Sequence, residues 1–239
     1  MVDLTFFDDD DEIVRGLIDP YVPQTGSTFI DVGADAGRWS NYLAPRFERV
    51  IAIEPEPVAY SQLNANRTDN VLPVLAALWS EPMLIELYIY SSPTHASIFS
   101  EDSSDEWGRL RGRSVSTLLC AATTLDHLAD NLDVRRCELV TIDTEGSEDQ
   151  VVKGGLQFIR EQVPELIIEV HRRENRDRIE KEIAPLGYRF RTVSDPAIKR
   201  GSEFCDDNYW LICQPPSRLT KKEVRREEEP SIAGSTFRV

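Results

Sequence analysis

The sequence has few cysteines, few basic residues relative to acidic ones, and no long hydrophobic run. Its 239 residues include 4 cysteines, which are scattered along the chain without a CxxC pair. The amino end does not resemble a secretory signal peptide. These two features exclude a disulfide framework and predict reduced thiols in a cytoplasmic protein.

Basic residues are outnumbered, since 27 Lys and Arg stand against 42 Asp and Glu, for a net charge of -15. Such a field repels a phosphate backbone, so nucleic acid is an unexpected partner. Arg109, Arg111 and Arg113 form one local basic group, which we assign to a solvated loop. No apolar run approaches the ~20 residues needed to span a bilayer, so no membrane association is predicted.

The apolar residues that are present fall in short runs separated by helical patterns. The runs are rich in β-branched residues and predict strands over 29–32, 50–53, 71–75, 139–142 and 166–170. Helices are predicted over 38–43, 57–66, 147–159 and 172–184. Near-continuous apolar strands that alternate with amphipathic helices predict an α/β fold with a doubly wound parallel sheet. Two last runs, 188–193 and 209–213, have no helical pattern between them and predict an antiparallel pair at the sheet edge.

The organisation predicts one domain over residues 1–214, in which 1–27 form an amino-terminal helix and lead-in. The highly charged remainder, 215–239, is predicted to be a disordered tail. Residues 84–90 alternate and predict an extra strand, and the polar stretch 91–113 predicts an excursion over one end of the sheet. Ser147 and Gln150 match the spacing of a capping box at a helix start.

The segment around Gly33 and Gly37 predicts a ligand-binding turn between the first strand and the following helix. Glycines let the backbone approach a ligand, and the amide groups of a helix start point toward it. Asp31 is placed to orient this turn or to contact the ligand. Glu54 ends the next strand, 23 residues after Asp31, where a carboxylate accepts hydrogen bonds from ribose hydroxyls. A tight structural turn and a solvated strand-end acid are the alternative interpretations.

The spacing of these glycines does not suit a dinucleotide. Gly33 and Gly37 form GxxxG, whereas a pyrophosphate-binding turn needs G-x-G-x-x-G. A cofactor without phosphates fits better, and S-adenosylmethionine is the obvious choice. An NAD-type oxidoreductase on the same scaffold is therefore the weaker hypothesis.

Several motifs in series resemble the FkbM-type methyltransferases. Residues 31–37, DVGADAG, are similar to that family's DVGANxG signature, with Asp35 where the family usually has Asn. An ionised Asp accepts hydrogen bonds but donates none, so the contact at this position differs. The further matches, in order along the chain, are IEP at 53–55, TLD at 124–126, IDTEGSE at 142–148, VKG at 152–154 and IEVH at 168–171.

The resemblance implies a Rossmann-like class I methyltransferase with seven main strands, the last antiparallel, and S-adenosylmethionine as cofactor. Ala77 and Leu78 end the third strand, where they can pack on an adenine ring or simply on the core. The predicted cofactor residues are Asp31, Gly33, Ala34, Asp35, Gly37, Glu54, Ala77, Leu78 and Asp143.

Polar residues at the ends of the fourth and fifth strands predict the acceptor site. Asp143 and His171 are the predicted catalytic residues, because either can remove a hydroxyl proton. Glu169 lies two residues before His171 and points to the same side, so one interpretation is that Asp143, Glu169 and His171 form an acceptor site or a metal site. The alternative is a structural polar pair of a strand-end histidine and its carboxylate neighbour. Glu145 is expected to tie down the loop and helix start, in preference to a functional role.

The resulting hypothesis is O-methylation of a hydroxyl on a sugar or small natural product, through an in-line displacement at the methyl carbon. The acceptor is a small molecule whose identity the sequence does not specify, and neither the oligomeric state nor a metal requirement is predicted. A non-catalytic module that binds the cofactor or a protein partner without turnover is the main alternative.

Overall fold

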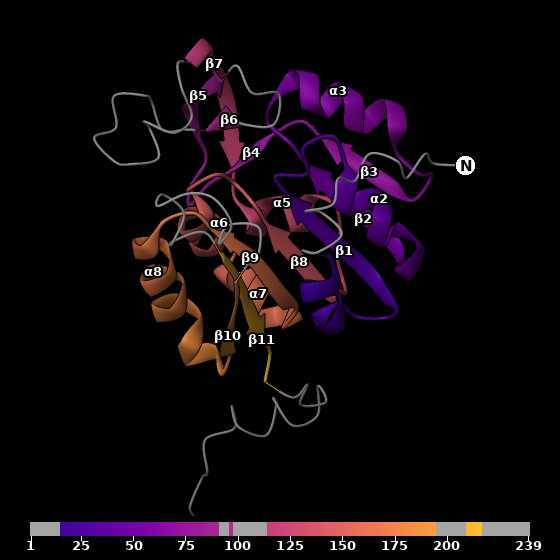
Figure 1. Cartoon of the computed structure of the whole chain (residues 1–239), viewed down its shortest axis with the longest axis vertical. Coiled ribbons are helices and arrows are strands. Elements are labelled where there is room, and N and C mark those ends of the chain that lie inside the picture. The colour runs from indigo at the N-terminus through magenta and orange to yellow at the C-terminus, as the bar shows by residue number, and fades with distance from the viewer. Residues whose placement is uncertain (1–14, 91–95, 98–113, 195–208, 217–239) are drawn as a thin grey trace, which may run out of the picture.

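The structure is a computed structural model that describes residues 15–90, 96–97, 114–194 and 209–216 (Figure 1). Most of the predicted excursion over 91–113, nearly all of the predicted tail and the start of the lead-in lie outside these residues. Residues 15–18 are helical, and Ile18 is buried. None of the described helices is long and apolar enough to cross a membrane.

A seven-stranded sheet with the order β10-β11-β9-β8-β1-β2-β3 forms the centre of the molecule (Figure 1). The strands are β1 Gly26–Val32, β2 Phe47–Ile53, β3 Val71–Val74, β8 Leu139–Ile142, β9 Glu165–Val170, β10 Arg189–Ser194 and β11 Tyr209–Gln214. β11 is antiparallel to β9 and β10, and the other neighbours are parallel. The predicted doubly wound sheet and its antiparallel last strand are confirmed. The strand order reverses at the β1/β8 boundary, the point where such sheets bind ligands.

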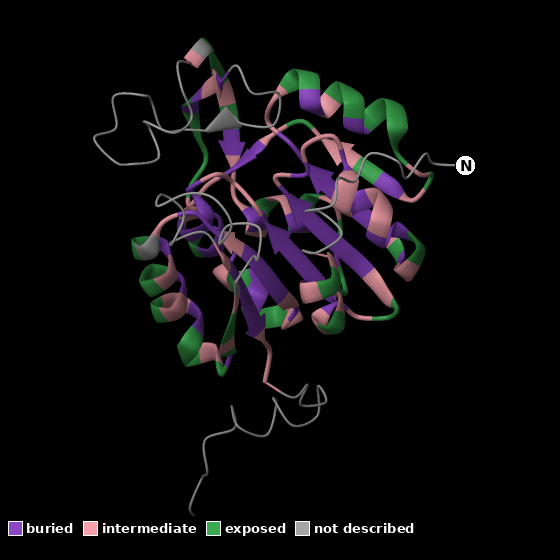
Figure 2. Ribbon diagram, viewed as in Figure 1, coloured by how far each residue is buried: buried purple, intermediate pink, exposed green. Residues whose placement is uncertain are grey.

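Helices cover both faces of this sheet, and its strands are buried (Figure 2). The helices are α2 Arg38–Leu43, α3 Pro57–Asn66, α5 Leu125–Asn131, α6 Glu148–Lys153, α7 Leu156–Gln162 and α8 Arg173–Ile183, with 3-10 turns at Asp19–Tyr21, Ala44–Arg46 and Ala184–Leu186. Alternate β1 side chains face opposite ways. Ile30 and Val32 belong to the core shared with α5 to α8, whereas Phe29 belongs to the core shared with α2 and α3.

A second sheet lies beside the first and has the order β4-β7-β5-β6. Its strands are β4 Ala77–Leu78, β5 Met83–Tyr90, β6 Ala96–Ser97 and β7 Ser114–Thr123. The predicted extra strand is thus β5, whereas sequence patterning missed β7. Ala77 and Leu78 do not end the third strand, because β3 stops at Val74 and the chain crosses to pair with β7.

The predicted helix over 147–159 is two helices, because Gly154 and Gly155 interrupt it. A side chain at Gly154 would come within 2.1 Å of the Trp79 carbonyl oxygen, and one at Gly155 within 2.7 Å of Leu125. The predicted capping box is also wrong. Ser147 donates its hydroxyl to the Thr144 carbonyl and makes no capping bond, so the helix start is held by other groups.

Gly33 lets the loop after β1 lie directly against the loop after β8. Its φ is +81°, in the left-handed region, and a Cβ there would lie 1.6 Å from the carbonyl oxygen of Asp143. The Asp143 amide donates to the Val32 carbonyl and holds this contact, while the Gly33 amide donates to Ile53 at the end of β2. Only glycine satisfies both the dihedral angle and the separation.

Replacing this glycine therefore tests the packing of the two loops. We expect Gly33→Ala to lower the free energy of unfolding by about 2–4 kcal/mol, because it adds left-handed strain and a backbone clash. Gly16→Ala is the matched control, since Gly16 is helical and a Cβ added there would meet nothing within 4 Å. Its expected effect is a gain of roughly 0.5–1 kcal/mol. Equal denaturant midpoints for Gly33→Ala and the wild type would contradict the packing argument.

Candidate functional site

The loops that follow β1, β2, β8 and β9 meet at the carboxyl edge of the central sheet. Neighbouring loops are joined by backbone hydrogen bonds: Gly33 and Ala34 both donate to Ile53, and Glu54 donates to Val74. The Ala34 amide is therefore engaged within the protein. Together with the bond from the Asp143 amide to the Val32 carbonyl, these bonds join the predicted cofactor turn, the predicted ribose acid and Asp143 along one edge.

The turn after β1 keeps an unusual backbone. Asp35 has φ +47° and Gly37 has φ +86°, so with Gly33 three residues of the turn are left-handed. The Asp35 amide donates to Glu54 Oε2 at 2.9 Å, and the Asp35 carboxylate lies 3.5 Å from Arg38. A left-handed non-glycine residue costs free energy and is typical of functional loops.

Asp31 is held by the protein on both of its carboxylate oxygens. It accepts hydrogen bonds from Ser40 at 2.5 Å and from Thr141 at 2.7 Å, and only 3% of it is exposed. Burial raises its pKa, while the two hydroxyl donors oppose that rise. Of the two predicted roles for Asp31, these contacts favour orienting the turn, since they connect β1 to α2 and β8.

Glu54 also supports the loops with both oxygens. Oε2 accepts from the Asp35 amide, and Oε1 accepts from the Glu56 amide at 2.8 Å. A carboxylate offers about four acceptor positions, so each oxygen keeps one for a ligand hydroxyl. Burial raises the pKa of Glu54 to about 7, despite the two amide donors. A buried carboxylate with spare acceptor positions is a suitable partner for two ribose hydroxyls.

A cavity of ≈ 420 Å³, counted with its opening to solvent, lies between this edge and the second sheet. Ala77 and Leu78 contribute to its wall from β4, not from the end of the third strand as predicted. Gly33, Ile53, Pro55 and Thr144 are among the other lining residues. The wall is mainly apolar, as expected for a surface that contacts a flat ring.

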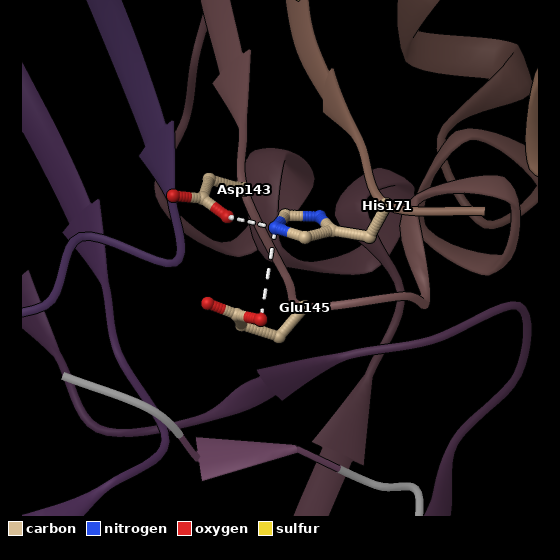
Figure 3. Close-up of side chains that lie close together, drawn as sticks. All are labelled: Asp143, Glu145 and His171. Carbon is tan, nitrogen blue, oxygen red and sulfur yellow. Dashed lines mark ion pairs between the residues drawn. The ribbon is translucent and has the colours of Figure 1, made fainter. Parts of the chain in front are cut away.

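Four carboxylates converge on one imidazole beside the cavity's Thr144 end. His171 Nε2 lies 3.7 Å from Asp143 Oδ1, 3.6 Å from Glu145 Oε2 and 3.8 Å from Glu169 Oε1. Figure 3 shows Asp143 and Glu145 pointing at the same ring nitrogen from nearby positions of one loop. The structure therefore brings together the three predicted residues Asp143, Glu169 and His171, and adds Glu145 to them.

Glu148 and Asn175 complete this cluster, and the sequence pattern predicted no role for either. His171 Nδ1 donates to Glu148 Oε1 at 2.9 Å, and Asn175 donates to Glu148 Oε2 at 2.6 Å. Glu148 also accepts from the Gly146 amide, so Glu148 ties down the start of α6. The signal in the sequence is the motif at 142–148, which ends on Glu148 but does not reveal its contact with the imidazole.

Burial and charge act in opposite directions on these groups. Burial alone would lower the pKa of His171, but Glu145, Glu148 and Glu169 outweigh it and hold that pKa well above its usual value. The pKa of Asp143 is raised well above normal by burial and by Glu169. Burial opposes ionisation of Glu148, yet His171 and Asn175 lower its pKa overall. Glu148 is therefore ionised and holds a proton on Nδ1 of the ring.

Comparisons with known proteins identify the family and the fold. Residues 31–190 match the family model of the methyltransferase FkbM domain. The fold is similar to the methyltransferase FkbM from Methylobacillus flagellatus KT, at 18% identity and TM-score 0.53, over 79% of this chain and 44% of that one. This chain thus spans less than half of that protein, and at such identity the likeness shows the fold alone.

A second solved structure is the precorrin-6y C5,15-methyltransferase from Geobacter metallireducens GS-15, at 11% identity and TM-score 0.49, over 90% of this chain and 100% of that one. No curated protein sequence matches the chain. The sequence motifs, from DVGADAG at 31–37 to IEVH at 168–171, all lie within the matched residues 31–190.

The raised pKa of Glu54 gives a pH dependence with a definite sign. Between its unfolded value of 4.5 and its folded value of about 7, the folded state binds more protons, so stability falls as pH rises. In the ligand-free protein, the free energy of unfolding of Glu54→Gln should therefore decrease with pH by roughly 3 kcal/mol less than that of the wild type. Urea unfolding at pH 4.5 and pH 8 measures the difference. Parallel profiles for wild type and variant would show that Glu54 is not the titrating group.

Proposed function

Because the chain belongs to the FkbM methyltransferase family, we propose that it transfers a methyl group from S-adenosylmethionine to a hydroxyl of a sugar or another small natural product. The observation that carries the proposal is the shared edge of the sheet. At one end of this edge lie a glycine turn that lacks the pyrophosphate-binding pattern and a carboxylate suited to bind ribose hydroxyls. At the other end lies a cluster of side chains that can accept a proton.

The cofactor half of the site consists of Gly33, Asp35, Gly37, Glu54 and the apolar cavity. Glu54 accepts the two ribose hydroxyls, and the cavity wall that includes Ala77 and Leu78 contacts the adenine ring. Gly33 keeps the turn free of side chains where the methionine part passes. Asp31 and Ala34 hold this half in place, because the Asp31 carboxylate and the Ala34 amide form hydrogen bonds within the protein.

The acceptor half lies at the ends of β8 and β9, around Asp143 and His171. The acceptor oxygen attacks the methyl carbon, the carbon–sulfur bond breaks, and its electron pair passes to the sulfur. Positioning the two reactants in line and excluding water supply most of the rate. Asp143 has a partly exposed side chain that reaches the acceptor, and it orients the hydroxyl and receives its proton.

The charge of the site supports a neutral hydroxylated acceptor. Three carboxylates lie within 3.8 Å of His171 Nε2, and the whole chain carries a net charge of -15. Such surroundings repel phosphorylated molecules and nucleic acids, whereas hydroxyl groups donate hydrogen bonds to carboxylates. The described cysteines Cys120, Cys137 and Cys213 are free thiols, which favours a cytoplasmic location for the reaction.

Cofactor binding is the first test. Titration calorimetry should show S-adenosylhomocysteine binding with a Kd of about 1–100 μM, in the range typical of such ligands. Glu54→Ala should weaken it by about 10–100-fold, because it removes charge-assisted bonds to the ribose. Asp126→Asn is a control, since Asp126 caps α7 and lies outside the site. Binding of NAD in place of S-adenosylhomocysteine would refute the proposal.

Turnover separates an enzyme from a binding module. Methyl transfer from labelled cofactor across a panel of sugars, polyols and phenols, with and without magnesium or EDTA, should yield a methyl ether. Asp143→Asn should lower kcat by about 10²–10⁴-fold, the usual contribution of a proton-transfer group. Its effect on S-adenosylhomocysteine affinity should stay below about tenfold. Cofactor binding without turnover on any acceptor would favour the non-catalytic alternative.

A further inference from the structure

We propose that Asp143, Glu145 and His171 form a binding site for one divalent cation, with Mn²⁺ as the preferred ion, at the acceptor end of the sheet. The cation holds the oxygen of the acceptor, a role that rests on the proposed methyl transfer. The cation site itself depends only on the side-chain arrangement in Figure 3.

The spacing of the candidate ligand atoms fits a shared ion. One atom from each of the three residues lies within 4.8 Å of the others, and the two carboxylates lie 3.6 Å and 3.7 Å from His171 Nε2. These separations exceed those of hydrogen bonds, about 2.7–3.2 Å. Ligands at about 2.1 Å from one cation lie about 3.0 Å apart at a right angle and about 4.2 Å apart when opposite. The two observed distances to Nε2 lie between these limits, so small adjustments complete the coordination.

Asp143 Oδ1 provides an independent indication of a missing partner. This oxygen is buried and accepts no hydrogen bond, although it is the oxygen that faces His171. A buried acceptor left unsatisfied is unfavourable, and more so when it is charged. A cation between Asp143, Glu145 and His171 would satisfy it and would offset the repulsion among the neighbouring carboxylates.

The ring of His171 is oriented for metal binding by residues behind it. Because Nδ1–H donates to Glu148 Oε1, the lone pair of the neutral ring lies on Nε2, which points at the two carboxylates. Glu148 is itself fixed by Asn175 and by the Gly146 amide. A carboxylate that holds the second nitrogen of a metal-binding histidine is a recurrent feature of metal sites. Glu148 and Asn175 are thus positioning residues.

The backbone also directs Glu145 into the site. Glu145 has φ +55° and is followed by Gly146 at φ +112°, so two successive residues leave the ordinary region. A left-handed glutamate costs free energy that a simple turn would avoid by using glycine. The conformation places Glu145 beside Asp143 in space even though one residue separates them in sequence.

The ligand types favour Mn²⁺ among the divalent cations. Carboxylates suit Mg²⁺, Ca²⁺ and Mn²⁺, whereas imidazole suits the transition metals, so a mixed set fits Mn²⁺ best. Glu169 Oε1, 3.8 Å from His171 Nε2, is placed to accept a hydrogen bond from metal-bound water. Three protein ligands leave about three positions of an octahedron open.

The open positions specify the class of acceptor. Two adjacent oxygens on one molecule can occupy neighbouring positions of the cation, so the geometry favours a vicinal diol such as that of a sugar ring. A bound cation lowers the pKa of a coordinated hydroxyl and stabilises the developing alkoxide. The released proton passes to a carboxylate of the cluster, and the acceptor oxygen then attacks the methyl carbon.

Direct metal binding tests the site without any assay of activity. Mn²⁺ titration of the full chain, followed by the paramagnetic resonance signal of the free ion at about 150 mM salt, should show one saturable site per chain. Asp143→Asn and Glu145→Gln should each weaken Mn²⁺ binding at least about tenfold. Glu148→Gln should weaken Mn²⁺ binding by no more than about 10–100-fold, because it acts through His171. The matched control is Glu138→Gln, a buried carboxylate next to the opposite end of β8, which should bind within about twofold of wild type.

A second readout identifies the imidazole and does not depend on a variant that folds poorly. Pulsed paramagnetic resonance on the wild-type Mn²⁺ complex should show coupling to one ring nitrogen, and His171→Gln should lose it. Circular dichroism confirms that each variant is folded. Absence of a saturable site, absence of nitrogen coupling in the wild type, or unchanged binding in both Asp143→Asn and Glu145→Gln would overturn the inference.

The metal site and the methyl transfer fail in different ways. If S-adenosylhomocysteine binds and Mn²⁺ does not, the cation site is wrong and the methyltransferase proposal stands. If Mn²⁺ binds at the cluster and S-adenosylhomocysteine does not bind, the cation site stands and the proposed function is wrong. A vicinal diol that tightens Mn²⁺ binding supports the acceptor class, and an unchanged Mn²⁺ affinity at saturating diol contradicts it.

Discussion

The contact of Gly33 with the Asp143 carbonyl is the constraint on which the rest of the site depends. Because residue 33 has no side chain, the loops after β1 and β8 meet at the point where the strand order reverses. Asp31 strengthens the same junction, because one of its carboxylate oxygens accepts a hydrogen bond from Ser40 and the other accepts one from Thr141. The cofactor turn and the carboxylate cluster are therefore fixed relative to each other by the sheet.

The site also depends on several buried carboxylates. Each is expensive to bury, and each of those at the site is surrounded by a distinct set of partners. Asp31 is satisfied by hydroxyls, Glu54 by amides, and Glu148 by His171 and Asn175. Asp143 Oδ1 differs from these because it has no donor. The contrast separates Asp143 from the buried carboxylates whose oxygens are already bonded within the protein.

The parts of the fold that follow a strong local pattern could be predicted from the sequence. Short β-branched runs specify the central strands, and the Glu54-Pro55 junction marks the end of β2 at the site. β7 was missed because its residues, SVSTLLCAAT, do not alternate, and it depends on pairing with β5 far along the chain. The sequence does not reveal why residue 154 is glycine, because the group that leaves no room for a side chain there is the distant Trp79 carbonyl. Glu148 resembles an ordinary helix-start acid until its contact with His171 is known.

The central claim is that one edge of the sheet holds a cofactor at Glu54 and an acceptor at the Asp143 cluster. A crystal structure of the chain with S-adenosylhomocysteine bound tests this most directly. We predict that both ribose hydroxyls contact the Glu54 carboxylate, that the adenine lies in the cavity beside Leu78, and that the sulfur faces Asp143. A ligand bound elsewhere, or a ribose that does not contact Glu54, would contradict it.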